Sequence, residues 1–227
     1  MSENKNGWII GLAAGAGALA LFTAVNRASR RYDFAEKVVL ITGGSRGLGL
    51  VMARDFASLG AKVAVLARDA DELERAKSDL ESFGSPVFSS VCDLTDQTAL
   101  EAAVLEVRNS LGPVDVLVNN AGVIQVGPLK EQTQKDFEDA MKIHFWAPYY
   151  AIQAVLPDMR DRGSGRIINI SSIGGKVAVP HLAPYCSSKF ALAGMSSAMH
   201  AELSKENIVV TTVYPGLMRT GSPRNAF

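Results

Sequence analysis

Six short apolar runs alternate with longer amphipathic stretches from Lys37 to the end of the sequence. Each run is nearly continuously apolar and rich in β-branched residues, which is typical of parallel strands covered by helices on both faces. This alternation predicts an α/β fold, a doubly wound parallel sheet (Rossmann fold) in a single domain. We expect strands at 37–42, 61–67, 86–91, 114–119, 165–171 and 207–214, and helices at 47–59, 69–83, 95–111, 133–161 and 182–205.

Three residues suggest where individual helices begin or end. Asp69 and Thr95 carry side-chain oxygens that can accept a hydrogen bond from the backbone at a helix start, so we expect both as N-caps. Pro157 has no N–H to donate and is expected to end or kink the fourth helix.

The first 31 residues differ in kind from the rest. Trp8–Val25 contains 18 residues without a charge, and Arg27, Arg30 and Arg31 follow it. A membrane span needs about 17 to 25 apolar residues, so this run just qualifies. The positive charge follows the run, which disfavours a secretory signal peptide and holds the rest on the cytoplasmic side.

We therefore expect 1–31 to be a membrane anchor and 32–227 to be a single folded domain facing the cytoplasm. A soluble cytoplasmic protein is the alternative. The last residues, 221–227, read as loop, which leaves open whether the domain continues beyond Phe227.

Charge and cysteine content exclude some classes of function. The chain has 23 basic and 23 acidic side chains, so nothing in its balance favours nucleic-acid binding. Cys92 and Cys186 can form no disulfide framework and lack zinc-ligand spacing. We predict no metal site, and we expect both thiols to be small buried side chains in a reducing compartment.

A glycine-rich loop joins the first predicted strand to the first predicted helix. Glycines at such a junction allow a tight turn and let a pyrophosphate reach backbone N–H groups at the helix start. The spacing Gly-x-x-x-Gly-x-Gly differs from the common fingerprint, and a glycine turn without a ligand is the alternative. The residues predicted to contact a cofactor here are Thr42, Gly43, Ser45, Arg46, Gly47, Leu48 and Gly49.

Ser172, Tyr185 and Lys189 form a set suited to acid–base chemistry. Reduction of a carbonyl needs a proton donor at the oxygen, and a free tyrosine with a pKa near 10 is poorly matched to neutral pH. Lys189 lies one helical turn after Tyr185, where its charge should lower that pKa. Ser172, at the end of the fifth strand, can hydrogen-bond and orient the reacting oxygen.

These motifs, with Asn119-Asn120-Ala121-Gly122 and Pro215-Gly216, stand in one order along the chain. In this they resemble the classical short-chain dehydrogenase/reductase family, over residues 37 to about 222. The resemblance implies an oxidoreductase that interconverts an alcohol and a ketone or aldehyde with a nicotinamide cofactor. It also implies cofactor contacts at Asp93, Leu94, Asn119, Ala121, Gly122, Tyr185, Lys189, Pro215, Gly216 and Thr220.

The end of the second strand bears on the choice of cofactor. An acidic residue there favours NAD by bonding the ribose 2′-hydroxyl, whereas a nearby arginine accommodates a 2′-phosphate. Ala67 stands at the expected acidic position and Arg68 follows it, while Arg46 in the glycine loop is a second candidate. We therefore expect NADP(H) to be favoured over NAD(H).

One residue departs from the family pattern. His144 stands where the family commonly has an asparagine that helps organise a proton path to the active lysine. An imidazole can still donate and accept hydrogen bonds, so His144 is a candidate catalytic residue. A structural role, satisfying nearby backbone groups, is the equal alternative.

Two mostly apolar segments, 123–128 and 177–182, follow strands whose carboxyl ends should face the substrate. They favour a lipophilic alcohol or carbonyl substrate. A non-catalytic dinucleotide-binding sensor or scaffold is the alternative function, and the family resemblance also implies self-association into homo-oligomers.

Overall fold

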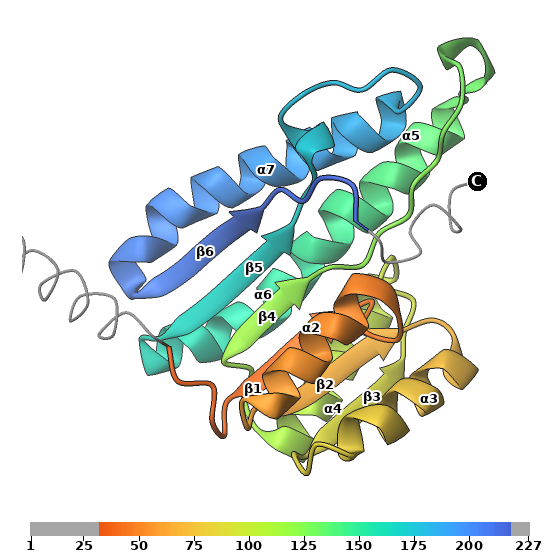
Figure 1. Cartoon of the computed structure of the whole chain (residues 1–227). Coiled ribbons are helices and arrows are strands. Elements are labelled where there is room, and N and C mark those ends of the chain that lie inside the picture. Colours follow the sequence, from red (N-terminus) through yellow and green to blue (C-terminus); the bar gives the residue numbers. More distant parts are fainter. Residues whose placement is uncertain (1–31, 219–227) are drawn as a thin grey trace, which may run out of the picture. The chain divides into compact units, whose positions relative to one another are not determined.

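The computed structural model describes residues 32–218, and its centre is a sheet of six parallel strands (Figure 1). The strand order is β3-β2-β1-β4-β5-β6, so the predicted doubly wound α/β fold is confirmed. Each predicted strand is present, with ends that differ by at most two residues. The strands are β1 (Val38–Thr42), β2 (Lys62–Ala67), β3 (Val87–Val91), β4 (Val116–Asn119), β5 (Gly165–Ile170) and β6 (Ile208–Val213).

Helices cover both faces of this sheet. α2 and α3 pack together over one face, and α4, α6 and α7 lie over the other (Figure 1). The α-helices are α2 (Gly47–Ser58), α3 (Ala70–Glu81), α4 (Gln97–Leu111), α5 (Gln134–Met141), α6 (Ala147–Arg162) and α7 (Ala183–Leu203). Short helical turns are η1 (Leu129–Glu131), η2 (Lys142–Trp146), η3 (Ile173–Gly175) and η4 (Ser204–Glu206).

The main apolar core lies between the sheet and the α4–α6 layer. Leu117 of β4 and Ile167 of β5 are fully buried there against Leu100, Ile152 and Met159 of the two helices. Each such side chain contributes about 1.5–3 kcal/mol when it leaves water. This layer fixes the strands whose carboxyl ends carry the candidate site.

The two predicted N-caps have different outcomes. Asp69 does cap α3, since its side chain accepts a hydrogen bond of 2.8 Å from the backbone N–H of Glu72. Thr95 was the wrong cap for α4: Asp96 is the N-cap and accepts from the N–H of Ala99 at 3.1 Å. The Thr95 hydroxyl instead donates to Asp93.

The predicted helix over 133–161 is present but differs in two ways. It does not end at Pro157, because α6 continues to Arg162. Pro157 and Gln153 are both exposed, so water can satisfy the carbonyl that the proline leaves without its helical donor. Between α5 and α6 the chain forms a π-helical turn, η2, which contains His144.

Three predictions lie outside the described residues, one of them the loop expected at 221–227. The expected membrane anchor falls in 1–31, and Thr220 follows the last described residue. From residue 32 to 218, none of the helices has the length and apolar character required to cross a bilayer.

Candidate cofactor and active site

The predicted site residues gather at the carboxyl edge of the sheet. Thr42, Asn119 and Ile170 are the last residues of the neighbouring strands β1, β4 and β5. The strand order reverses between β1 and β4, and in open α/β sheets the crevice at such a point is where ligands bind. The glycine loop and the catalytic candidates therefore lie at the same edge of the sheet, where such a crevice is expected.

The glycine loop leaves the start of α2 open to an anion. Gly43 has φ +66°, and a Cβ at Gly49 would lie 2.1 Å from the carbonyl oxygen of Gly43, so the loop packs too closely for side chains. Arg46 precedes α2 in extended conformation, and within the described chain no side chain caps this helix and no acid stands in its first turn. The free N–H groups fit a pyrophosphate.

Asn120 braces this loop and was missed as a site residue by the sequence analysis. Its side-chain amide donates to the carbonyl oxygens of Thr42 and Gly43, both at 3.1 Å. In return the Thr42 hydroxyl accepts from the backbone N–H groups of Asn120 at 3.0 Å and Ala121 at 3.3 Å. The Asn-Asn-Ala-Gly motif carried the signal, but it does not say which asparagine holds the loop.

The side chain of Asn119 is engaged inside the fold. It is 3% exposed and donates to Asn169 at 2.8 Å, which in turn donates to Ser196 at 2.8 Å. This buried polar ladder fixes β4 to β5 and to α7. The cofactor contact that the family resemblance implies for Asn119 stays a prediction.

Three further residues expected to contact the cofactor, Arg68, Asp93 and Leu94, follow the ends of β2 and β3. Asp93 accepts hydrogen bonds from the N–H and hydroxyl of Thr95 at 3.0 and 2.8 Å. These bonds lower the pKa of the Asp93 carboxyl, and the charge of Arg68 acts in the same direction. Arg68 is exposed, whereas the side chain of Leu94 is 4% exposed and belongs to the apolar core.

Glu72 is a second residue that the sequence analysis missed. One of its carboxylate oxygens accepts from the hydroxyl of Ser45 at 3.0 Å, and the other pairs with the guanidinium of Arg46 at 2.9 Å. The first turn of α3 is thereby tied to the glycine loop. No local sequence pattern signals a contact across 26 residues.

Ser172 and Tyr185 meet at the end of β5. The Ser172 oxygen accepts from the N–H of Gly174 at 3.1 Å. Burial raises the pKa of Tyr185, and the nearby Ser172 side chain partly opposes this. The lowering of this pKa that we expected from Lys189 is not found: the largest effect on Tyr185 is its burial, which disfavours the charged phenolate.

Lys189 is held near Tyr185 by a hydrogen bond to Ile170, the last residue of β5. Its ammonium donates to the carbonyl of Ile170 at 2.9 Å and lies 5.8 Å from the centre of the Tyr185 ring. The side chain is 4% exposed, and this burial lowers its pKa from 10.5 to about 8. The site thus contains a buried cation beside a hydroxyl.

His144 connects the loop after β4 to α7. Its Nε2 accepts from the backbone N–H of Val123 at 3.2 Å, so Nδ1 carries the proton and donates to the Ser188 hydroxyl at 2.8 Å. Ser188 donates in turn to the carbonyl of Tyr185 at 2.8 Å. Burial and the nearby charge of Lys189 hold the pKa of His144 well below 6.5, so its ring is neutral.

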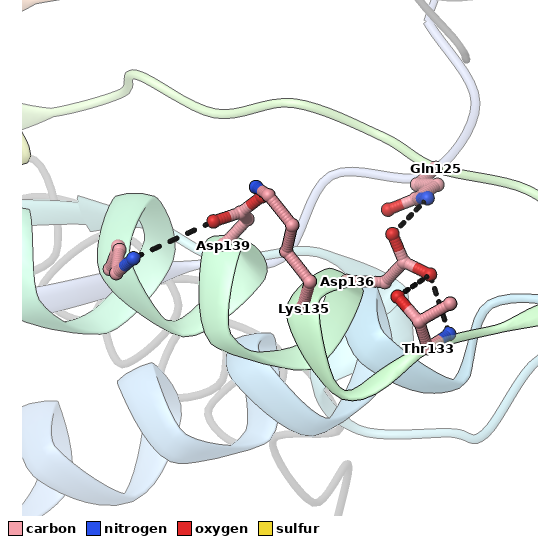
Figure 2. A network of polar contacts seen from close by, with 6 residues as sticks. Gln125, Thr133, Lys135, Asp136 and Asp139 are labelled. Atoms are coloured by element: carbon pink, nitrogen blue, oxygen red, sulfur yellow. Dashed lines mark hydrogen bonds and ion pairs between the residues drawn. The ribbon is translucent and has the colours of Figure 1, made fainter.

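The two apolar segments expected at the substrate mouth are joined by hydrogen bonds. The N–H of Gly127 donates to the carbonyl of His181 at 3.0 Å, and the Gln132 amide donates to the Gly127 carbonyl at 2.8 Å. Figure 2 shows Gln125 reaching Asp136, which also caps the start of α5 through Thr133; the Gln125–Asp136 distance is 2.6 Å.

The segment after β6 lies beside the residue that follows Ser172. The N–H of Ile173 donates to the carbonyl of Pro215 at 3.0 Å, which brings Pro215 and Gly216 beside the catalytic candidates. Between residues 32 and 218 there is no group of three or more His, Cys, Asp or Glu side chains that could hold a metal ion.

The chain is similar to known dehydrogenases over most of its length. A family model described as short chain dehydrogenase matches residues 37–227. Gluconate 5-dehydrogenase of Gluconobacter oxydans is 36% identical over 181 residues, which are 80% of this chain and 71% of that protein. Dehydrogenase/reductase SDR family member 7B of Danio rerio is 35% identical over 222 residues, covering 95% of this chain and 72% of that protein.

A solved structure has the same fold. NAD⁺-bound xylitol dehydrogenase superposes with a TM-score of 0.79 at 31% sequence identity, covering 82% of this chain and 72% of that one.

Proposed function

Because the chain belongs to the short-chain dehydrogenase family, whose members are NAD(P)-dependent oxidoreductases acting on CH–OH groups, we propose that it interconverts an alcohol and a ketone or aldehyde with Tyr185 as the general acid and base. The observation that carries this proposal is the joint placement of Ser172, Tyr185 and Lys189 at the carboxyl edge of the sheet. The open start of α2 lies at the same edge.

In reduction, the Tyr185 hydroxyl donates its proton to the carbonyl oxygen, and Ser172 hydrogen-bonds the same oxygen. The hydride would come from a nicotinamide bound at this edge of the sheet, and would return to it in the reverse direction. The ammonium of Lys189 favours the phenolate that remains on Tyr185. A hydrogen bond of 2.9 Å from the Lys189 ammonium to the Ile170 carbonyl oxygen keeps this charge in place.

The proposed cofactor is NADP(H). Arg68 is exposed at the end of β2, and Ala67 leaves no carboxylate at the position that would bond a ribose 2′-hydroxyl. Arg46 stands at the entrance to α2 with its side chain 60% exposed. Two cations are thus available to a 2′-phosphate.

The proposed substrate is lipophilic. Val126 on one wall segment and Val177 and Val179 on the other are exposed by 51, 59 and 37%. Exposed apolar side chains on two segments that hydrogen-bond each other support a pocket wall that would bury an apolar ligand.

We further propose that 1–31 anchors the protein to a membrane with 32–227 on the cytoplasmic side. The uncharged run Trp8–Val25 and the arginines that follow it support this. The relative from Danio rerio aligns with 95% of the chain, so the alignment reaches into this segment. Sedimentation of the full chain with membranes, and its release on deletion of 1–31, would support the anchor; an unchanged soluble fraction would contradict it.

Tyr185→Phe tests the enzymatic proposal. The full chain is assayed with NADPH and a panel of lipophilic ketones and aldehydes. We expect turnover to fall by about a thousandfold or more, since the proton donor is lost, while NADPH affinity changes by less than about twofold. Equal turnover in both proteins would contradict the role of Tyr185. Cofactor binding with no turnover of any substrate by the wild type would favour a sensor or scaffold.

A further inference from the structure

We infer that Glu72 tunes the choice of cofactor: its carboxylate competes with the ribose 2′-phosphate for Ser45 and Arg46, and so weakens NADPH binding without affecting NADH. The inference rests on the proposed use of NADP(H) and adds a residue, from α3, that the cofactor-contacting loop itself does not contain.

Glu72 already occupies two of the groups that a 2′-phosphate could use, the Ser45 hydroxyl and the Arg46 guanidinium. Ser45 has one hydroxyl proton, and Glu72 accepts it at 3.0 Å. The guanidinium of Arg46 is directed at the other carboxylate oxygen at 2.9 Å. A phosphate offers acceptor oxygens and negative charge, as a carboxylate does, so it must take over the same donors.

The fold keeps Glu72 in this place. Its own backbone N–H is capped by Asp69 at 2.8 Å, which fixes the first turn of α3, and a carboxylate is favoured at that end of a helix. The side chain of Glu72 is 21% exposed, against 60% for Arg46. The carboxylate is therefore the better ordered partner of the pair.

Other charged groups line the same space as the Glu72–Arg46 pair. A cavity of about 250 Å³ lies between α2 and α3, lined by Ser45, Arg46, Arg54, Glu72, Arg75 and Asp79 together with two apolar residues. Arg54 is paired with Asp79 at 2.6 Å, away from the loop. Removing the charge of Glu72 thus releases Arg46 and Ser45 without releasing a second ion pair.

Glu72→Gln in the full chain tests the inference, with NADPH and NADH dissociation constants measured by fluorescence titration. Glu74→Gln is the matched control, because it removes an exposed carboxylate from the same helix at a residue for which no contact with the loop is found in the described chain. We expect Glu72→Gln to tighten NADPH about three- to tenfold and to change NADH by less than about twofold. Glu74→Gln should change the two dissociation constants only by the small effect of removing one negative charge from the surface.

Equal changes for the two cofactors, weaker NADPH binding, or the same effect from both variants would overturn the role of Glu72. A double-mutant cycle with Arg46→Ala adds a second criterion: the gain from Glu72→Gln should shrink when Arg46 is absent, because only Ser45 is then left to be released. Persistence of the full gain would overturn the competition. The wild-type ratio of NADPH to NADH affinity tests the proposed cofactor separately, since the inference concerns only the change in that ratio.

Discussion

The Nδ1 atom of His144 lies 2.8 Å from the hydroxyl oxygen of Ser188, and that hydroxyl donates a hydrogen bond to the backbone carbonyl of Tyr185. The other ring nitrogen is held by the N–H of Val123. Both nitrogens of a buried neutral imidazole are thus used to join two chain segments of the site. We therefore expect His144 to position Tyr185 and not to carry protons.

Replacement of His144 separates these roles. His144→Leu leaves the Val123 N–H and the Ser188 hydroxyl without this partner, so we expect a loss of about 1–3 kcal/mol in the free energy of unfolding. His144→Asn can retain one of the bonds and should lose less of both stability and kcat. Urea unfolding and steady-state kinetics measure the two effects.

The pH dependence of kcat in these variants shows whether His144 relays protons during turnover. Since burial keeps the pKa of His144 far below neutral, wild type and His144→Asn should share the same acid limb of kcat against pH. An acid limb that moves or disappears in His144→Asn would show that the imidazole titrates during turnover. Tyr185→Phe cannot serve here, because it removes the reaction itself.

The buried ammonium of Lys189 should make stability depend on pH. The pKa is about 8 in the folded protein and 10.5 as a free side chain, so between these values the unfolded chain binds more protons. The unfolding free energy of wild type should therefore rise relative to Lys189→Met, by about 2 kcal/mol from pH 7 to pH 10. Chemical denaturation of both proteins at the two pH values gives this difference, and a constant gap would contradict the lowered pKa.

Two glycine substitutions should have opposite effects. In Gly49→Ala the new methyl would lie 2.1 Å from the Gly43 carbonyl oxygen and 2.6 Å from the Asn120 amide, so the loop must shift. We expect a loss of about 3 kcal/mol of stability and of cofactor affinity. Gly194→Ala is the control: nothing lies within 4 Å of its added Cβ, and an exposed helical site should gain about 1 kcal/mol in urea unfolding.

Arg68→Asp tests the proposed 2′-phosphate partner. The new carboxylate would repel the phosphate and could accept from a ribose hydroxyl, so NADPH affinity should fall about tenfold or more while NADH affinity holds or rises. Lys205→Asp is the charge-matched control, because Lys205 lies in η4, before the start of β6 and so at the opposite edge of the sheet. Parallel losses in both variants would indicate a general charge effect.

The strands were predictable because most of the apolar runs are buried on both faces of the sheet. Their order in the sheet was not predicted. Helix boundaries were harder to predict where two neighbouring residues can both accept a hydrogen bond at the helix start. Thr95 and Asp96 are both good N-caps, and geometry selects Asp96. Pro157 was expected to end or kink its helix, but nothing in the sequence shows that its turn faces water and so permits the helix to continue.

The site was predictable at the level of its motifs and not of its internal contacts. Tyr185 and Lys189 are related by one helical turn, which the sequence displays directly. The link from His144 to Ser188 spans 44 residues, and the bond from Ser45 to Glu72 spans 27. Such pairs depend on how helices pack against each other, and the same packing decides that desolvation raises the pKa of Tyr185.

The π-helical turn η2 fixes the rotational phase between α5 and α6. An extra residue in a helix turns everything before it by about 100° relative to everything after it. Ala140 before the turn and Ala147 after it both point into the protein, and His144 lies buried between them. The length of the segment from Lys142 to Trp146 therefore matters as well as its sequence. Deletion of any one of these residues would rotate a whole helix face away from the protein, whereas a substitution would alter one side chain.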